Sequence, residues 1–519
     1  MAQLAPIDIV APGAAGLNTE KGSVLLPPQW ATVATNAVIN NAGRISSRKG
    51  WSNQTTGAIS GTPSIDIIFE YLNESGTATV ISTANNKVYK DTDDFTDAAN
   101  DITSTTAPTA DYWQFVNFNG KVIGFQDGHT PIEWSGSGDF TDQSYTGTGP
   151  DGNCACAAFG RIWAADADKQ TIRVSALLDD TDYSSASGGG TIDMSSIWTQ
   201  GMDEIVAIRA IGANLVVFGR NHIVFWADGS GSEIGMTLSA AEVVDTIEGT
   251  GCIARDSIAL TGEGDLIFLS RHGIQSLGRV IESKSNPTVI LSKNVRTDVL
   301  SSISTQRLTD SNFDQVNAVH SPEEGAYIIS FPADNKMYVL DTHHPFVDDD
   351  DEQVFPVTTW NMGGSIRGLC VRKNGDLLFG SSGVIGKYAT TTDNDDSFFF
   401  DFWTGWIDFE DMNHRLKILK EIQASVLIGT GDLIWKWEFD FSSNNSTRTV
   451  SYTGGTQAEF SIGQYSVDEF SGGVTIQRKR FPAHGEGQFL RLGVEATVSG
   501  FNMVIQHMGI APKIGRMVT

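Results

Sequence analysis

The stretch Tyr112–Trp134, YWQFVNFNGKVIGFQDGHTPIEW, decides the fold that the sequence predicts. It begins with an apolar run, turns at Asn119-Gly120, and continues into Lys121–Phe125, which is nearly all apolar. A third short apolar run ends at Trp134. Asn-Gly between two such runs is a strong β-hairpin signal, because both residues tolerate the positive φ angles of tight turns. The stretch therefore predicts three short antiparallel strands.

The same pattern recurs along the chain at intervals of roughly 40–60 residues, which is the range expected for propeller blades. The copies are Ile65–Lys90, Tyr112–Trp134, Cys154–Val174, Ile205–Trp226, Ile258–Leu277, Val316–Leu340 and Ile366–Tyr388. Their middle strands are almost continuously apolar, as strands buried on both faces would be. Each copy after the first has a turn glycine suited to positive φ. These glycines are Gly120, Gly160, Gly212, Gly264, Gly325 and Gly375.

We interpret these copies as a β-propeller of six or seven blades that occupies residues 61–395. Unrelated hairpins in β-sandwiches are the alternative interpretation. Three long inserted loops, 227–251, 280–313 and 341–359, interrupt the copies, and the polar segment Asn294–Ser311 predicts a short helix. Long loops at one end of a propeller commonly bind partners.

The pattern changes after residue 395. Phe398–Asp411 alternates aromatic and polar residues, and two further long alternating stretches follow it. Several such strands predict a β-sandwich, here called the platform, over residues 396–519. Five aromatic residues are its expected core: Phe402, Trp403, Trp406, Trp435 and Trp437. Together with the propeller, this platform makes the chain all-β.

Residues 1–60 are interpreted as an N-terminal arm and hairpin that join the platform. Within Leu26–Trp51, two short strands flank a turn at residues 40–43. Three cations, Arg44, Arg48 and Lys49, follow this turn closely in an otherwise acidic chain. A solvated basic end of a hairpin is the simplest interpretation of these residues.

The net charge of −27, from 62 acidic and 35 basic side chains, disfavours a protein that grips nucleic acid, because such proteins need clustered cations. An acidic surface would instead let DNA slide past without sticking, although solubility alone also explains it. Four scattered cysteines indicate reduced thiols and synthesis in the cytoplasm. We expect no signal peptide and no membrane span.

No pattern of catalytic residues is recognisable, so we expect no enzyme, no catalytic residues, no cofactor and no metal. The acidic run Asp91, Asp93, Asp94 and Asp97 lacks the glycine and closing glutamate of a calcium loop. The neighbouring His343 and His344 are poorly placed to converge on one ion. A second acidic run, formed by Asp348, Asp349, Asp350, Asp351 and Glu352, is interpreted as an extended loop.

Two regions of the sequence resemble the tail nozzle, or tail hub, proteins of short-tailed bacteriophages. The first is carried by Gly16, Leu17, Asn18, Leu26, Pro27, Asn36, Gly43, Ile45, Arg48 and Gly50. The second lies in the platform, where WTGWID, KILKEI and the terminal MGIAPKIGR occur in that order. The blades and their inserts carry no specific match.

The resemblance implies a virion tail protein, made in the cytoplasm of a bacterial host. It would form a ring of six subunits below the portal and adaptor proteins, retain the genome and pass double-stranded DNA during ejection. Its other expected partners are tail fibres or a needle. Arg44, Arg48 and Lys49 would contact a neighbouring subunit or the adaptor, and Asp348–Glu352 would face the lumen or the tip. A glycan-binding or glycan-degrading propeller is the alternative function.

Overall fold

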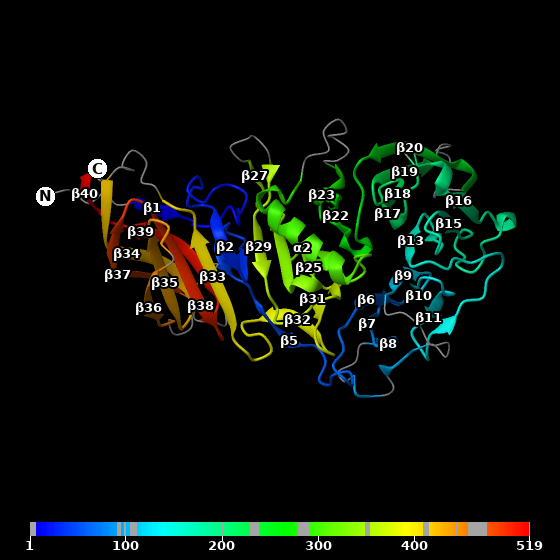
Figure 1. Ribbon diagram of the computed structural model, residues 1–519. Coiled ribbons are helices and arrows are strands. Elements are labelled where there is room, and N and C mark those ends of the chain that lie inside the picture. Colours follow the sequence, from blue (N-terminus) through cyan, green and yellow to red (C-terminus); the bar gives the residue numbers. More distant parts are fainter. Residues whose placement is uncertain are drawn as a thin grey trace.

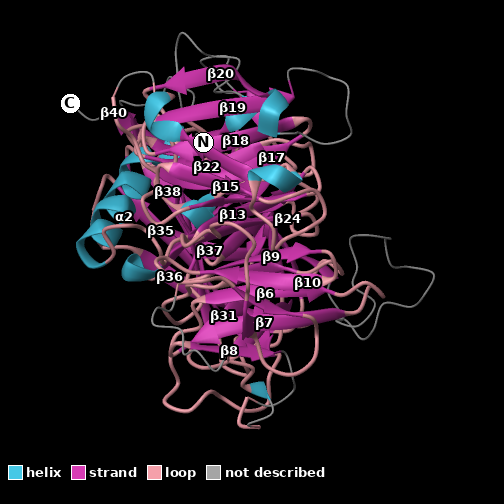
Figure 2. Ribbon diagram, turned by 90° about the vertical axis from the view of Figure 1, so that its right-hand side faces the viewer, coloured by secondary structure: helices cyan, strands magenta, loops and turns pink. Residues whose placement is uncertain are grey.

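The computed structural model describes residues 7–90, 95–97, 100–103, 112–198, 201–228, 238–278, 290–347, 353–407, 415–442, 444–454 and 475–517. The chain forms two β-rich bodies that lie end to end, a sandwich and a propeller (Figure 1). Strands dominate both bodies, and helix α2 (Arg296–Thr309) packs beside the propeller (Figure 2). The all-β expectation is confirmed, as is the short helix within Asn294–Ser311.

Six blades of the propeller are separate antiparallel sheets. In five of them neighbouring strands follow one another in chain order, whereas the sixth adds a strand of the N-terminal arm after β32. The first blade consists of β6 (Ile67–Leu72), β7 (Ala78–Ala84) and β8 (Lys87–Lys90). The second consists of β9 (Gln114–Phe118), β10 (Lys121–Phe125), β11 (Ile132–Trp134) and β12 (Thr141–Asp142). The third consists of β13 (Cys154–Ala158), β14 (Arg161–Ala165), β15 (Thr171–Val174) and β16 (Gly190–Asp193). The fourth blade consists of β17 (Ile205–Ile211), β18 (Asn214–Gly219), β19 (His222–Asp228) and β20 (Ala241–Glu248). The fifth consists of β21 (Ala259–Leu260), β22 (Leu266–Ser270) and β23 (Gly273–Ser276). The sixth consists of β30 (Leu369–Val371), β31 (Leu377–Gly380), β32 (Ile385–Thr390) and β5 (Gly50–Asn53).

A further unit of the same design lies between the fifth and sixth of these sheets. It consists of β24 (Asn317–Ser321), β25 (Ala326–Phe331), β26 (Lys336–Asp341) and β29 (Val357–Trp360). This unit continues beyond β29 into the sandwich, and it is therefore the structural link between the two bodies.

The middle strands of the blades are buried, as their apolar sequences predicted. All five residues of β14 and all six of β25 are buried, for example. The six turn glycines adopt φ angles from 56° to 93°, which is the conformation that L side chains rarely reach. The hairpin pattern in the sequence therefore identified the repeating unit correctly.

The long inserts contain more of the propeller than their sequences suggested. The outer strand β20 lies within residues 227–251, and the outer strand β29 begins within residues 341–359 and ends one residue beyond them, at Trp360. The latter insert also holds a small hairpin of β27 (Phe346–Val347) and β28 (Gln353–Val354). Outer blade strands are less apolar than the middle ones, which is why the sequence pattern did not reveal them: four of the eight residues of β20 are exposed.

The sandwich packs two sheets face to face around one core. One sheet has the order β3 (Ala37–Ile39), β4 (Ile45–Ser47), β39 (Met503–Ile510), β34 (Arg415–Ile428), β37 (Thr475–Gly487), and β1 (Ile7–Val10) and β40 (Lys513–Met517) join it at β39 and β34. In the nine-stranded sheet, β29 is followed by β2 (Ala31–Thr35), β33 (Phe398–Thr404), β38 (Leu490–Val498), β35 (Gly431–Phe439) and β36 (Ser446–Tyr452). The five predicted aromatic core residues are all buried.

The N-terminal arm contributes to both bodies. Strands β1 to β4 complete the two sandwich sheets, whereas β5 pairs with β32 as the outer strand of a propeller blade. The predicted hairpin is confirmed, because Ile39 pairs with Ile45 and Ala37 with Ser47. Only the part of residues 1–60 before β5 therefore belongs to the platform sheets. Among the described residues, no helix is long and apolar enough to cross a membrane.

Candidate functional site: the junction of propeller and sandwich

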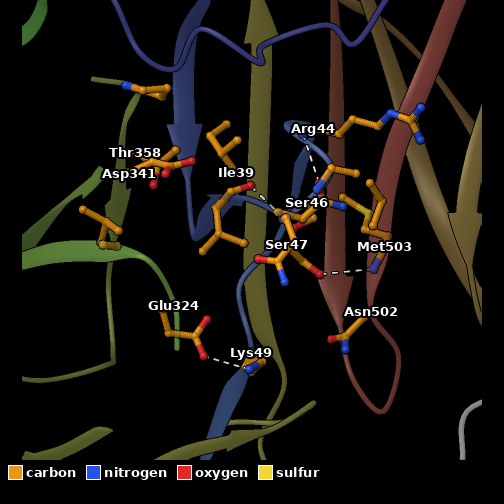
Figure 3. Close-up of a pocket in the computed structure, with 18 of the residues that line it drawn as sticks. Ile39, Arg44, Ser46, Ser47, Lys49, Glu324, Asp341, Thr358, Asn502 and Met503 are labelled. Atoms are coloured by element: carbon orange, nitrogen blue, oxygen red, sulfur yellow. Dashed lines mark hydrogen bonds and ion pairs between the residues drawn. The ribbon is translucent and has the colours of Figure 1, made fainter. Parts of the chain in front are cut away.

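A cleft lies where the N-terminal hairpin meets both bodies (Figure 3). Its larger, more polar part has a volume of ≈ 490 Å³, and a neighbouring part of ≈ 320 Å³ reaches beneath the hairpin. Both parts share five lining residues: Lys49, Glu323, Glu324, Tyr388 and Asn502. The arm, two blades and the sandwich thus all contribute to one hollow.

Arg48 lies beside this cleft and is fully buried, with an exposed fraction of 0%. Its guanidinium forms a two-pronged ion pair with Asp393, with Nη1···Oδ1 at 2.7 Å and Nη2···Oδ2 at 2.6 Å. Its Nε donates to the Asn36 side chain, and its remaining donors reach the carbonyls of Lys49 and Asn361. All five guanidinium donors are therefore satisfied. The guanidinium also lies 4.0 Å above the centre of the Phe398 ring.

This arrangement corrects the predicted role of Arg48. A buried cation whose donors are all used within its own chain cannot also pair with a neighbouring subunit or an adaptor. Asp393 precedes the first sandwich strand after the propeller, and Arg48 precedes β5. The ion pair therefore ties together the two places where the chain crosses between the bodies.

Asn36 stabilises the same junction between the propeller and the sandwich. It has a left-handed φ of 53°, which asparagine tolerates better than most residues. Its amide nitrogen donates to the Phe399 carbonyl at 2.6 Å, and its side-chain oxygen accepts from the backbone N–H of Asn361 at 2.8 Å. Asn36 thus joins β2, β29 and β33 at the point where the blade becomes the sandwich sheet.

Lys49 faces the cleft and pairs with Glu324 at 2.7 Å, so its partner also lies within its own chain. The Lys49 side chain is 42% exposed, and it remains reachable from solvent. Its backbone N–H donates to the Tyr388 hydroxyl, and the Tyr388 ring stacks on Trp360 at 4.8 Å. Burial raises the pKa of Tyr388 well above its ordinary value, which keeps this hydroxyl neutral.

Arg44 is half-buried and lines the smaller part of the cleft, where the structure places it near the sandwich strand that holds Met503. The neighbouring Ser47 hydroxyl accepts from the Met503 N–H at 3.2 Å. Across the cleft, the side-chain oxygen of Asn502 is buried and has no hydrogen-bond partner among the described residues. Of the three predicted cations, Arg44 and Lys49 thus share this cleft, and Arg48 lies inside the protein.

The acidic run Asp348–Glu352 lies outside the described residues, and so do Asp91, Asp93 and Asp94. His344 is described, and its Nδ1 lies 2.8 Å from Asp341 Oδ2 in the same turn. Across the ranges that the structure describes, no three His, Cys, Asp or Glu side chains gather as metal ligands would.

A second buried arginine, Arg255, lies between blades of the propeller. Arg255 pairs with Asp256 at 2.6 Å and stacks on the Tyr112 ring at 4.0 Å. It also donates to the carbonyls of Trp113 and Asn153, just before β9 and β13. Burial raises the pKa of Tyr112 well above its ordinary value, so its hydroxyl stays neutral and donates to Asp256. These charged groups bind one another and hold two blades together.

Sequence reasoning missed Arg48, Asn36 and Arg255 as buried centres. Their partners are distant in the chain, with Arg48 and Asp393 separated by 345 positions. No local pattern marks such a pair. The order of Asn36, Arg48 and Gly50 in the nozzle resemblance was the only signal that pointed to this region.

No protein-family model matches the chain, and no curated protein matches it significantly. Solved structures that are similar to it include the WD40 domain of Neurospora crassa Pan2, with 7% identity over 67% of this chain and 98% of that chain and a TM-score of 0.38. YCF48 bound to D1 peptide has 10% identity over 66% of this chain and 98% of that chain, with a TM-score of 0.35. The WD40 propeller domain of Doa1 has 13% identity over 52% and 90%, with a TM-score of 0.29. The assignment of a propeller rests on the sheet topology described above.

Proposed function

We propose that this protein is a subunit of the tail nozzle of a short-tailed bacteriophage. In this role it forms a ring of six copies around the DNA channel, below the portal and adaptor proteins, retains the genome and passes it during ejection. The protein is structural and performs no catalysis. Its place in the infected cell is the host cytoplasm during synthesis and the virion tail after assembly.

The observation that carries the proposal is the continuous nine-stranded sheet. A propeller that merely binds a partner can be linked to a second domain by a flexible segment. Here β29 of the propeller pairs directly with β2 of the sandwich at Thr359 and Thr35, and the Arg48–Asp393 pair lies at the same junction. A subunit that must hold a pressurised genome benefits from such a rigid connection, because force on one body is transmitted to the other.

The charge of the chain supports a conduit. A net charge of −27 repels phosphate, so DNA that passes such a surface has little tendency to bind it. This support is independent of the sheet, because it comes from composition. The resemblance in the N-terminal arm and the platform is the third line of support.

Light scattering tests the proposal. It measures the mass of the purified protein in solution, first alone and then mixed with the adaptor–portal complex of its phage. We expect a six-fold ring, either alone or on that complex. A monomer that ignores the complex would contradict the proposal. Binding to a glycan array would then support the alternative function of a glycan-binding or glycan-degrading propeller.

A further inference from the structure

The chain is electrically asymmetric. Of its 35 basic and 62 acidic side chains, the platform (residues 396–519) holds 11 and 14, which leaves 24 and 48 for residues 1–395. The platform is thus close to neutral, with a net charge of −3, whereas residues 1–395 carry −24 of the total of −27. This difference is hidden in the overall charge.

Four of the eleven cations of the platform lie on its two edge strands. In the two sheet orders, β36 and β37 are the last strands, and they lie at the end away from the propeller (Figure 1). The side chain of Gln477 on β37 donates to the Thr453 carbonyl just after β36, which places the two edges side by side. Within the described ranges, β36 pairs only with β35 and β37 only with β34, so each strand has a second edge of backbone N–H and C=O groups that no described strand pairs with.

Four cations follow this edge, which we call the cationic edge: Arg448, Arg478, Lys479 and Arg480. Arg478 and Arg480 point to the same face because strand side chains alternate, and Arg448 is exposed on β36. The Arg480 side chain is 65% exposed and lies 3.6 Å from Glu421. Among the residues that the structure describes, no other ion pair involves this edge. Ile476, at 64% exposure, adds an apolar contact on the same face.

We propose that the cationic edge binds the acidic body of a second copy of this chain, so that it forms a seam between neighbouring subunits. The proposal rests on the proposed ring and names the surface that closes it. Two copies gain electrostatic energy when the cationic edge of one meets the acidic body of the next. Because the two surfaces differ, the contact is head-to-tail, which is the kind that generates a ring.

A protein partner fits this edge better than DNA does. DNA binding requires enough cations to displace many counterions, and here four cations lie on a body of net charge −27. The open backbone groups of an edge strand also match another polypeptide, because a strand can add to the sheet there. Neither feature favours a nucleic acid.

The test compares two variants with the same change in charge. The first is Arg478→Glu with Arg480→Glu, on the cationic edge. The control is Arg271→Glu with Lys373→Glu, two exposed cations on propeller turns. Assembly of each into a ring is measured by light scattering on the adaptor–portal complex, at about 0.05 M and about 0.5 M salt, where screening differs strongly. Circular dichroism confirms that both variants are folded.

We expect the edge variant to lose at least tenfold in ring assembly at low salt, and the control variant to assemble like the wild type. Equal assembly of the wild type and both variants would overturn the seam and leave the nozzle function standing. Failure of the wild type itself to form a ring would overturn the nozzle function, and the seam with it. Retention of double-stranded DNA by the wild type but not by the edge variant would assign the edge to nucleic acid instead.

Discussion

At the scale of single residues, Arg48 shows how a charge can serve the fold. A buried ion pair costs desolvation energy, so it adds little net stability when both partners are present. Removal of one partner strongly destabilises the folded state, because the charge of the other partner is then buried without a counter-charge. Since the Asp393 side chain is only 12% exposed, water cannot replace the arginine there.

Substitution Arg48→Met is therefore expected to lower the free energy of unfolding by about 3–5 kcal/mol. The matched control is Lys49→Met, whose side chain is 42% exposed, and it should cost no more than about 1 kcal/mol. Urea unfolding followed by tryptophan fluorescence measures both. Similar effects of the two substitutions would show that the burial of Arg48 has no energetic consequence.

His320 predicts a pH dependence. Burial lowers the pKa of its imidazole, and the neighbouring His343 lowers it further. A histidine whose pKa is lower in the folded state binds fewer protons there than when unfolded. Stability is therefore complete above the unfolded pKa of about 6.5 and is lost as the pH falls below it. The urea midpoint should drop between pH 7.5 and pH 5.5, and the drop should be smaller in His320→Gln.

The four cysteines provide a test of burial. All are free, and burial raises the pKa of Cys154 and Cys252 to about 11 and that of Cys370 to about 12. Thiolates are the reactive form, so these three thiols should resist a thiol reagent at about pH 8 in the folded protein. After unfolding in guanidinium chloride, all four should react. Rapid reaction of three or more in the folded protein would contradict the described core.

At the scale of elements, the propeller is closed by a strand from the other end of the chain. Gly50 begins β5, and a Cβ atom there would lie 2.1 Å from the Thr392 carbonyl oxygen. The backbones of the arm and of the segment after β32 thus approach one another as closely as only glycine permits.

Gly50→Ala should therefore destabilise the protein by at least ~1–3 kcal/mol, because backbone must move to admit the methyl group. The control is Gly262→Ala, where nothing lies within 4 Å of the added carbon. Thermal unfolding of both variants measures the difference. Equal melting temperatures would show that β5 does not seal the blade as described.

The elements also mark what sequence can and cannot predict. Apolar middle strands and turn glycines are local signals, so the blades were predictable from hairpins such as Lys121–Phe125. The link from β29 to β2 was not, because it is a parallel pairing at Thr35 and Thr359 between segments far apart in the chain. The buried ion pair beside the candidate site could not be predicted either, because its two residues are also far apart in the chain. A basic run at the end of a hairpin indicates solvent exposure, and only the fold brings Asp393 to Arg48.

At the scale of the whole molecule, the N-terminal arm makes the sandwich a composite of both ends of the chain. Without it, the C-terminal sheets lack β1 to β4 and expose the face that Ala31, Ala37 and Ile45 cover. A fragment of residues 396–519 is therefore expected to remain unfolded. Its amide NMR spectrum should be poorly dispersed, whereas a well-dispersed spectrum would mean that the sandwich folds without the arm.

We propose that copies of this protein encircle a DNA channel, and electron microscopy of the protein bound to its adaptor–portal complex would reveal such a ring. We expect a closed ring of identical copies, coaxial with the portal, with the sandwiches toward the adaptor and an open passage at the centre. Particles without bound protein, or with single copies scattered over the outside of the complex, would contradict it.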